Sequence, residues 1–210
     1  MKKQWKWQLL ASSLCLFALL AWWVVQGQSL AFDTYIYQAL HSSLPTSILP
    51  LMRLITEFGG TVGIVLLCIL ALFVFGLLKR QHFGWLFVLN CSVSALINVV
   101  LKHVFVRQRP MINQLVSVSG YSFPSGHAMA STAFYGLLAM ILWRNVKTPW
   151  LRNVLCSGCV LLVLLIMVSR VYLGVHYASD VLAGSLLSVA ILILFTSAGK
   201  KVLGDRYLVF

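Results

Sequence analysis

One short stretch carries residues whose types and order suit anion chemistry. The sequence YSFPSGHAM begins at Tyr121 and stands immediately before a long apolar run. We expect a helix to begin here, with Pro124 near its first position, where the missing N–H costs nothing, and Ser125 as its cap. Gly126 leaves the first N–H groups accessible, and free N–H groups at a helix start favour anions, phosphate in particular. His127 then places a titratable imidazole beside that anion.

A second pair of residues has the spacing of a nucleophile or base with its orienting partner. His176 and Asp180 are four residues apart, which predicts that their side chains stack on one face of a helix. A carboxylate in that position can hold one imidazole nitrogen and aim the other outward. Ser125 is an alternative nucleophile, but the G-x-S-x-G turn that exposes a serine nucleophile is absent.

The composition is that of a membrane protein. Of 210 residues, 60% are apolar and 10% are charged, whereas soluble domains carry about 25% charged residues. The 16 Lys and Arg residues against four acids give a net charge of +12, which must be tested against membrane topology before nucleic-acid binding is inferred. The five cysteines all fall inside apolar runs, which indicates buried side chains and no structural disulfide.

Six apolar runs of about 16–20 residues have the length that a bilayer requires of a helix. The sequence therefore predicts an all-α integral membrane bundle of six transmembrane helices, one domain over residues 1–210. Short surface helices are expected between the first two spans, from Gln26 to Gly60. The first run follows three lysines like a signal peptide, but its length and the Trp22-Trp23 pair favour a retained helix. The runs are Leu9 to Val25, Thr61 to Leu78, Gly84 to Leu101, Ala128 to Trp143, Val154 to Val168 and Tyr177 to Thr196.

The distribution of Lys and Arg predicts the orientation. With both termini in the cytoplasm, eleven cations lie inside and five outside, as the positive-inside rule favours, so the +12 needs no nucleic-acid partner. The inside group is Lys2, Lys3, Lys6, Lys79, Arg80, Arg144, Lys147, Arg152, Lys200, Lys201 and Arg206, and the outside group is Arg53, Lys102, Arg107, Arg109 and Arg170.

Four of the outside cations lie close to the candidate catalytic residues. Lys102 and Arg109 are seven residues apart, two helical turns, so both can face one way, and Pro110 then ends any helix. Arg170 stands at the same depth, and Arg107 either contacts headgroups or belongs to the site. Only three acids, Asp33, Glu57 and Asp180, lie on that side. Because clustered, unpaired cations at a membrane boundary are costly, we expect an anionic ligand there.

Together these residues resemble the type 2 phosphatidic acid phosphatases. The resemblance covers about Leu101 to Asp180 by motif and the whole chain by its six-helix layout, which is similar to compact bacterial phosphatidylglycerophosphate phosphatases of type B. All eleven specified residues of the family's three-part signature are present in order: Lys102 and Arg109-Pro110, then Pro124-Ser125-Gly126-His127, then Ser169-Arg170, His176 and Asp180.

The resemblance implies roles for these residues. His176 would attack the phosphorus and form a phosphohistidine, Asp180 would orient its ring, and His127 would protonate the lipid alcohol and then activate water. The resemblance implies a lipid phosphate substrate and a reaction without a metal or cofactor. The charge distribution predicts a multi-pass cell-membrane protein with an extracytoplasmic active site. Membrane lipids are the other expected partners, and the sequence indicates no obligate protein partner. The phosphate oxygens would be bound by Lys102, Arg109, Ser125, Gly126 and Arg170.

The lipid remains open at this point. Phosphatidylglycerophosphate, phosphatidic acid and undecaprenyl diphosphate all fit, because the signature recognises the phosphate and not the tail. A lipid-phosphate binding or transport protein is the alternative outside the enzyme class, and the pairing of His176 with Asp180 argues against it. A vanadate-dependent peroxidase would share the anion pocket, but those enzymes are soluble. We expect selectivity to reside in the stretch from Gln26 to Gly60.

Overall fold

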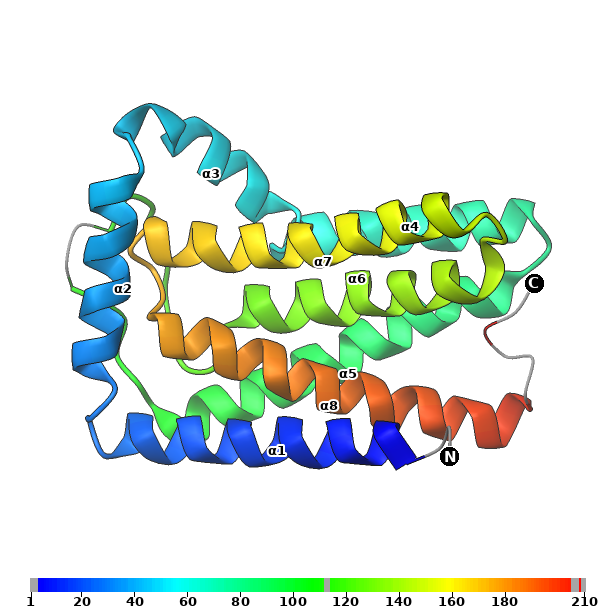
Figure 1. Cartoon of the computed structure of the whole chain (residues 1–210), viewed down its shortest axis with the longest axis horizontal. Helices are drawn as coiled ribbons and strands as arrows, with labels where there is room; N and C mark the ends of the chain where they lie inside the picture. Colours follow the sequence, from blue (N-terminus) through cyan, green and yellow to red (C-terminus); the bar gives the residue numbers. More distant parts are fainter. Residues whose placement is uncertain (1–3, 112–113, 205–207, 209–210) are drawn as a thin grey trace.

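The computed structural model describes residues 4–111, 114–204 and 208, and these form a bundle of long helices (Figure 1). Lys2, Lys3 and Arg206, which were assigned to the inside, lie outside the described residues. Within the described part, five helices are long and apolar enough to cross a membrane. They are α1 (Gln4–Val25), α5 (Gln81–Phe105), α6 (Gly126–Asn145), α7 (Pro149–Tyr172) and α8 (Ala178–Leu203).

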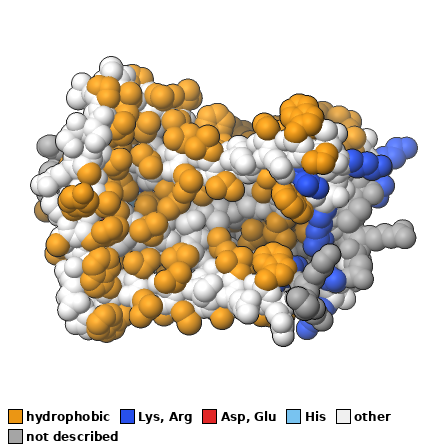
Figure 2. Space-filling view, in the orientation of Figure 1, with side chains coloured by type: hydrophobic (Ala, Val, Ile, Leu, Met, Phe, Trp, Pro, Cys, Tyr) orange, Lys and Arg blue, Asp and Glu red, His pale blue; other side chains and the backbone are white. Residues whose placement is uncertain are grey.

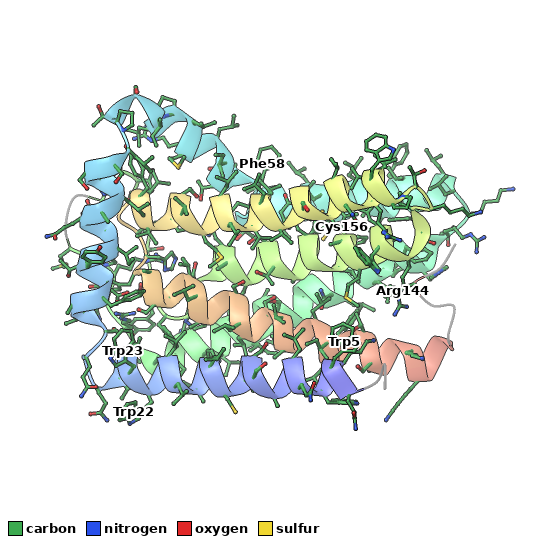
Figure 3. All side chains as sticks on the ribbon, viewed as in Figure 1. Trp5, Trp22, Trp23, Phe58, Arg144 and Cys156 are labelled. Carbon is green, nitrogen blue, oxygen red and sulfur yellow. The ribbon has the colours of Figure 1, made fainter. Side chains whose placement is uncertain are left out.

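The sixth span is a bent pair of helices. The segment Thr46–Glu57, a 3-10 turn (Thr46–Ile48) followed by α3 (Leu49–Glu57), meets α4 (Thr61–Leu77) at an angle of 48°. A Cβ atom on Gly63 would lie 1.9 Å from the carbonyl oxygen of Glu57, so only glycine lets the chain fold back so closely. The predicted six-helix membrane bundle is therefore confirmed, with one span broken near Phe58 (Figure 3).

The outer surface matches a bilayer. Hydrophobic side chains cover the length of the bundle, whereas the visible Lys and Arg side chains gather at the end that carries the chain termini (Figure 2). The exposed tryptophans of α1 lie near its two ends, Trp5 at one and Trp22 at the other (Figure 3). An apolar surface with cations gathered at one end, and tryptophans near both ends of a span, is typical of a bundle that crosses a bilayer.

Polar and small residues join the helices inside this apolar bundle. Asn90 of α5 donates to the carbonyl oxygen of Ala133 at 2.8 Å, and Asn98 donates to that of Pro124 at 2.9 Å. Amide side chains within a membrane are expected to form such hydrogen bonds between helices. Gly184 of α8 lies so close to the start of α6 that a Cβ atom would come within 2.7 Å of the Ser125 carbonyl oxygen. The absence of a side chain at Gly184 therefore lets α8 pack closely against the start of α6.

A short helix covers the end of the bundle opposite the termini. The helix α2 (Leu30–Ser43) crosses this end, and α3 slants away from it before the chain enters α4 (Figure 1). The helix α2 is one of the short helices expected between the first two spans, and α3 joins α4 in the broken second span. The stretch from Gln26 to Gly60 therefore lies at the end where α5 and α7 finish and where α6 and α8 begin.

Candidate active site

The predicted site residues meet at the end of the bundle that α2 covers. A cavity of about 990 Å³ opens there, between the ends of the long helices and the non-helical segment that links α5 to α6. Two of the eight predicted residues, Asp180 and Ser125, are fully buried beside it. Six of the eight predicted residues line this cavity: Lys102, Arg109, Gly126, His127, Arg170 and His176.

His176 lies in the turn before α8, not on the helix itself. Tyr177 caps α8, and Asp180 occupies the third position of its first turn, where its Oδ2 accepts from the Tyr177 N–H at 2.9 Å. The same Oδ2 lies 3.3 Å from Nδ1 of His176. The predicted contact is therefore present, but the predicted shared helix face is wrong, because the carboxylate of a capping box reaches backwards over the helix start.

The contacts of the His176 ring define its tautomer. Nη1 of Arg109 lies 3.2 Å from Nε2, and a guanidinium can only donate, so Nε2 carries the lone pair. The ring proton is then on Nδ1, facing Asp180. Burial lowers the pKa of His176 to about 4, although Asp180 opposes that shift. The imidazole is therefore neutral at pH 7, with its nucleophilic nitrogen on the side of Arg109, which lines the cavity.

Arg109 reaches the cavity from a non-helical segment. The helix α5 ends at Phe105, and Val106 adopts the left-handed conformation with a φ of 49°, which is strained for a β-branched residue. The prediction that Lys102 and Arg109 share one helix face is therefore wrong, because the helix ends between them. The chain instead folds back, and the Arg109 guanidinium donates to the Gly120 carbonyl at 2.9 Å and to that of Val175 at 2.7 Å.

The start of α6 has the predicted cap. Ser125 is the N-cap, and its Oγ accepts from the Ala128 N–H at 3.5 Å. Pro124 precedes the cap and does not occupy the first helical position. A Cβ atom on Gly126 would lie 3.0 Å from Oδ1 of Asn98, so glycine suits this close contact. Ser125 does not line the cavity, and a bond from its hydroxyl to phosphate stays a prediction.

His127 stands in the cavity beside the break between α3 and α4. A Cβ atom on Gly60 would lie 3.4 Å from its Nε2. No hydrogen bond joins the His127 ring to any residue that the structure describes, in contrast to the ring of His176. The His127 ring is therefore available to a ligand in the cavity.

Three cations line the cavity without a carboxylate partner among the described residues. The ion pairs formed by the described residues involve Arg107 and His176, and none includes Lys102, Arg109 or Arg170. Arg170 is buried, its Nη1 donates to Oγ1 of Thr56 at 2.9 Å, and its Nε has no partner among the described residues. Because a buried cation without a counter-ion is costly, an anion in the cavity would complete this site.

Three residues behind the cavity were not assigned a role from the sequence. Arg107, left open between headgroup and site, forms ion pairs with Asp33 at 2.8 Å and with Asp180 at 2.6 Å. Ser122 donates its hydroxyl to Oδ2 of Asp180. Thr56 holds Arg170. The scarcity of acids on this side was the available signal for Arg107, since few carboxylates could serve as its partner.

Known proteins are similar to this chain over much of its length. The chain is 33% identical over 127 residues to phosphatidylglycerophosphatase B of Bacillus subtilis, a match that covers 59% of this chain and 62% of that protein. It is 26% identical over 167 residues to an undecaprenyl-diphosphatase of Sulfolobus acidocaldarius, covering 76% of this chain and 75% of that one.

The fold is also that of a solved relative. The structure superimposes with a TM-score of 0.82 and 28% identity on the crystal structure of a transmembrane PAP2 type phosphatidylglycerolphosphate phosphatase from Bacillus subtilis, covering 92% of this chain and 96% of that one. A model of the PAP2 superfamily matches residues 83–202. The chain therefore belongs to the PAP2 superfamily.

Proposed function

We propose that this membrane protein is a lipid phosphate phosphatase that hydrolyses the phosphomonoester of phosphatidylglycerophosphate, with phosphatidic acid as a second monoester substrate. The observation that carries this proposal is the neutral His176, whose Nε2 lone pair lies in a cavity that three unpaired cations line. A phosphate in that cavity would meet a nucleophile, a second imidazole and several donors. These are the groups that phosphoryl transfer requires.

The first step would transfer the phosphoryl group to the protein. Nε2 of His176 forms a bond to phosphorus while the bond from phosphorus to the lipid oxygen breaks. The bound phosphate anion offsets the neighbouring cations, so His127 takes up a proton from the substrate or from water and donates it to that oxygen, and the lipid leaves as an alcohol. Asp180 retains its contact with the Nδ1 proton and stabilises the positive charge that develops on the phosphorylated ring.

The second step would release phosphate. His127, now neutral, accepts a proton from water while the water oxygen attacks phosphorus and the phosphorus–nitrogen bond breaks. Inorganic phosphate leaves and His176 is neutral again. Proton transfer of this kind contributes about 10²–10⁴-fold to a rate. One imidazole therefore serves as acid in the first step and base in the second.

The cations would bind the phosphate oxygens in both steps. Lys102, Arg109 and Arg170 line the cavity with the first residue of α6, Gly126. Each preorganised donor aimed at developing charge is worth about 10²–10³-fold in rate. We propose that these side chains and the helix start replace a metal ion, and that the Ser125 hydroxyl adds a further donor.

The shape of the cavity supports a lipid substrate. From the cationic end it continues along α4 and α5, where apolar side chains predominate. A lipid chain can remain in that apolar part while its phosphate reaches His176. The cavity is therefore lined by residues of α4 as well as of α5. Its apolar lining includes Ile64, Val65, Ile69, Leu72 and Val88.

Undecaprenyl diphosphate is the second candidate substrate. The similarity to the undecaprenyl-diphosphatase of Sulfolobus acidocaldarius extends over 76% of this chain. The cationic end of the cavity suits the terminal phosphate of a diphosphate as well as a monoester. Its apolar part suits a prenyl as well as an acyl chain.

We further propose that the termini are cytoplasmic and that the active site is extracytoplasmic. The Lys and Arg side chains visible at the terminus end support this orientation (Figure 2). Cysteine labelling of intact cells, with single cysteines placed at Ser119 and at Lys147 in a background without the native cysteines, tests it. An impermeant reagent should label position 119 and not position 147.

The purified protein in detergent tests the activity. We expect inorganic phosphate release from one of the three lipids in the presence of a metal chelator. A competition assay among them identifies the preferred lipid. Lipid transport in vesicles without phosphate release would favour the binding or transport alternative. Loss of activity in chelator would contradict metal independence.

A further inference from the structure

Arg107 joins three elements that are far apart in the sequence, on the side of Asp180 away from the cavity. Its Nη1 donates to Oδ1 of Asp180 at 2.6 Å and to the hydroxyl of Ser179 at 2.8 Å. Its Nη2 donates to Oδ2 of Asp33 at 2.8 Å and to the hydroxyl of Ser29 at 3.1 Å. One guanidinium therefore links the end of α5, the region of α2 and the first turn of α8.

The two oxygens of Asp180 have different partners. Oδ1 receives the N–H of Arg107, whereas Oδ2 faces the Nδ1 of His176 and also accepts from the Ser122 hydroxyl. Because the rigid fork of Arg107 holds Oδ1, the carboxylate cannot rotate without losing a charge-assisted bond. The orientation of the His176 ring therefore depends on a cation that does not line the cavity.

Asp33 is the second anchor of this cation. Its Oδ1 accepts from the backbone N–H of Ser179 at 2.8 Å, and its Oδ2 accepts from the Ser179 hydroxyl at 2.8 Å. The side chains of Asp33 and Asp180 are fully buried, and that of Arg107 is 11% exposed. A buried charge cluster is stable only when its hydrogen bonds are complete, and here the bonds to Asp33 pin α2 onto the first turn of α8.

We infer that Arg107 and Asp33 are positioning residues for the reaction, which hold Asp180 so that it keeps His176 in the tautomer with an unprotonated Nε2. This inference rests on the proposed function for its kinetic consequences. It also assigns a role to α2, which lies outside the residues 83–202 that the superfamily model matches. A cluster that merely stapled α2 to the bundle would affect stability and leave the His176 tautomer unchanged.

The test compares Arg107→Met with Arg152→Met. Both arginines lie over an aromatic ring, Arg107 over Tyr177 at 4.0 Å and Arg152 over Trp143 at 4.3 Å, but Arg152 belongs to the terminus end and forms no ion pair with a described carboxylate. In Arg107→Met we expect kcat for phosphate release to fall about 10²-fold with KM within about threefold, since an orienting group is lost and the phosphate contacts remain. Arg152→Met should retain kcat.

The second readout is the ¹⁵N spectrum of the His176 ring in histidine-labelled protein, assigned with His176→Ala. Wild-type protein should show the Nδ1–H tautomer, and Arg107→Met a mixture of tautomers. Arg107→Lys keeps the charge without the fork, so we expect about a tenfold loss of kcat. If Arg107→Met does not fold, kcat and the His176 spectrum of Arg107→Lys decide in its place.

An Arg107 variant that keeps kcat within about threefold of the Arg152→Met control, or an unchanged His176 spectrum, would overturn the inference. If wild-type protein releases no phosphate from any of the lipids, the proposed function fails. The ¹⁵N spectra alone then decide whether Arg107 orients His176.

Discussion

Arginine serves different purposes at the two ends of this bundle. At the terminus end, Arg144 lies where α6 finishes (Figure 3), and Arg152 stacks over the ring of Trp143. Neither forms an ion pair with a carboxylate among the described residues. At the other end, Arg170 is buried beside the cavity, and Arg107 is almost fully enclosed between two carboxylates.

Access to water explains this difference. A cation at a polar membrane boundary is satisfied by water and lipid headgroups, so it can act as an orientation signal at little cost. A cation withdrawn from water requires a counter-ion. Arg107 has Asp33 and Asp180 for this purpose, whereas Arg170 has the neutral Thr56 hydroxyl. The cations at the cavity are therefore suited to bind an anion. Matched substitutions at the two ends should distinguish anion-binding cations from those that act as orientation signals.

Replacing the proposed nucleophile should have the largest effect. His176→Ala removes the nitrogen atom that we propose bonds to phosphorus, and we expect kcat to fall by at least about 10⁴-fold. His82→Ala is the matched control, because His82 lies in the first turn of α5 at the terminus end and should leave kcat unchanged. Phosphate release in detergent measures both. His176→Ala with turnover within about tenfold of wild type would rule out a phosphohistidine.

Replacing a cavity cation should have the next largest effect. Arg170→Met removes a buried donor that would bind phosphate oxygens, and we expect a loss of about 10²–10³-fold in kcat/KM. Arg144→Met removes a cation from the terminus end, and kcat/KM should change by less than about threefold. Comparable losses in the two variants would show that the ends of the bundle do not differ in the way argued above.

Most of the architecture and the composition of the site could be predicted from the sequence. Apolar length identified the six spans, because a bilayer imposes one dimension on every helix that crosses it. Motif spacing identified Lys102, Arg109, His127 and Arg170 as neighbours before their positions were known. These inferences rest on the length of apolar runs and on the spacing of motif residues, both of which can be read directly from the sequence.

The contacts that depend on irregular backbone could not be predicted. The spacing of Lys102 and Arg109 suggested one helix face, but the left-handed turn at Val106 ends α5 between them. No local pattern indicated that Asp33, 74 residues before Arg107, would pair with it. The capping contact that turns Asp180 towards His176 could not be predicted either, because it depends on α8 beginning after His176, with Tyr177 as its N-cap. Tertiary partners of buried charges become visible only when the fold brings distant segments together.

Adding one methyl group at a glycine should test how precisely the start of α6 must be placed for activity. Gly126 begins α6, and a Cβ atom there would lie 3.0 Å from Oδ1 of Asn98, so Gly126→Ala should displace this amide and the helix start. We expect about a tenfold loss of kcat/KM, measured as above, because small misplacements of donors are costly. Gly158→Ala in α7 meets nothing within 4 Å and should keep full activity. Equal activity of the two variants would show that the helix start tolerates movement.

Lowering the pH to 5 should have the smallest effect, because the charge of the His176 ring should hardly change. This small effect is informative. Burial lowers the pKa of His176 to about 4, so the ring stays more than about 90% neutral at pH 5, whereas an exposed histidine of pKa ~6.5 would be only about 3% neutral. The ¹⁵N signals of His176 should therefore titrate with a midpoint near 4. The unfolded chain takes up this proton first, so the contribution of His176 to stability is retained above about pH 6.5 and declines as pH falls towards 4. A midpoint above 6 would mean that the ring is solvated, and the enclosed, neutral nucleophile that separates this end of the bundle from the other would not exist.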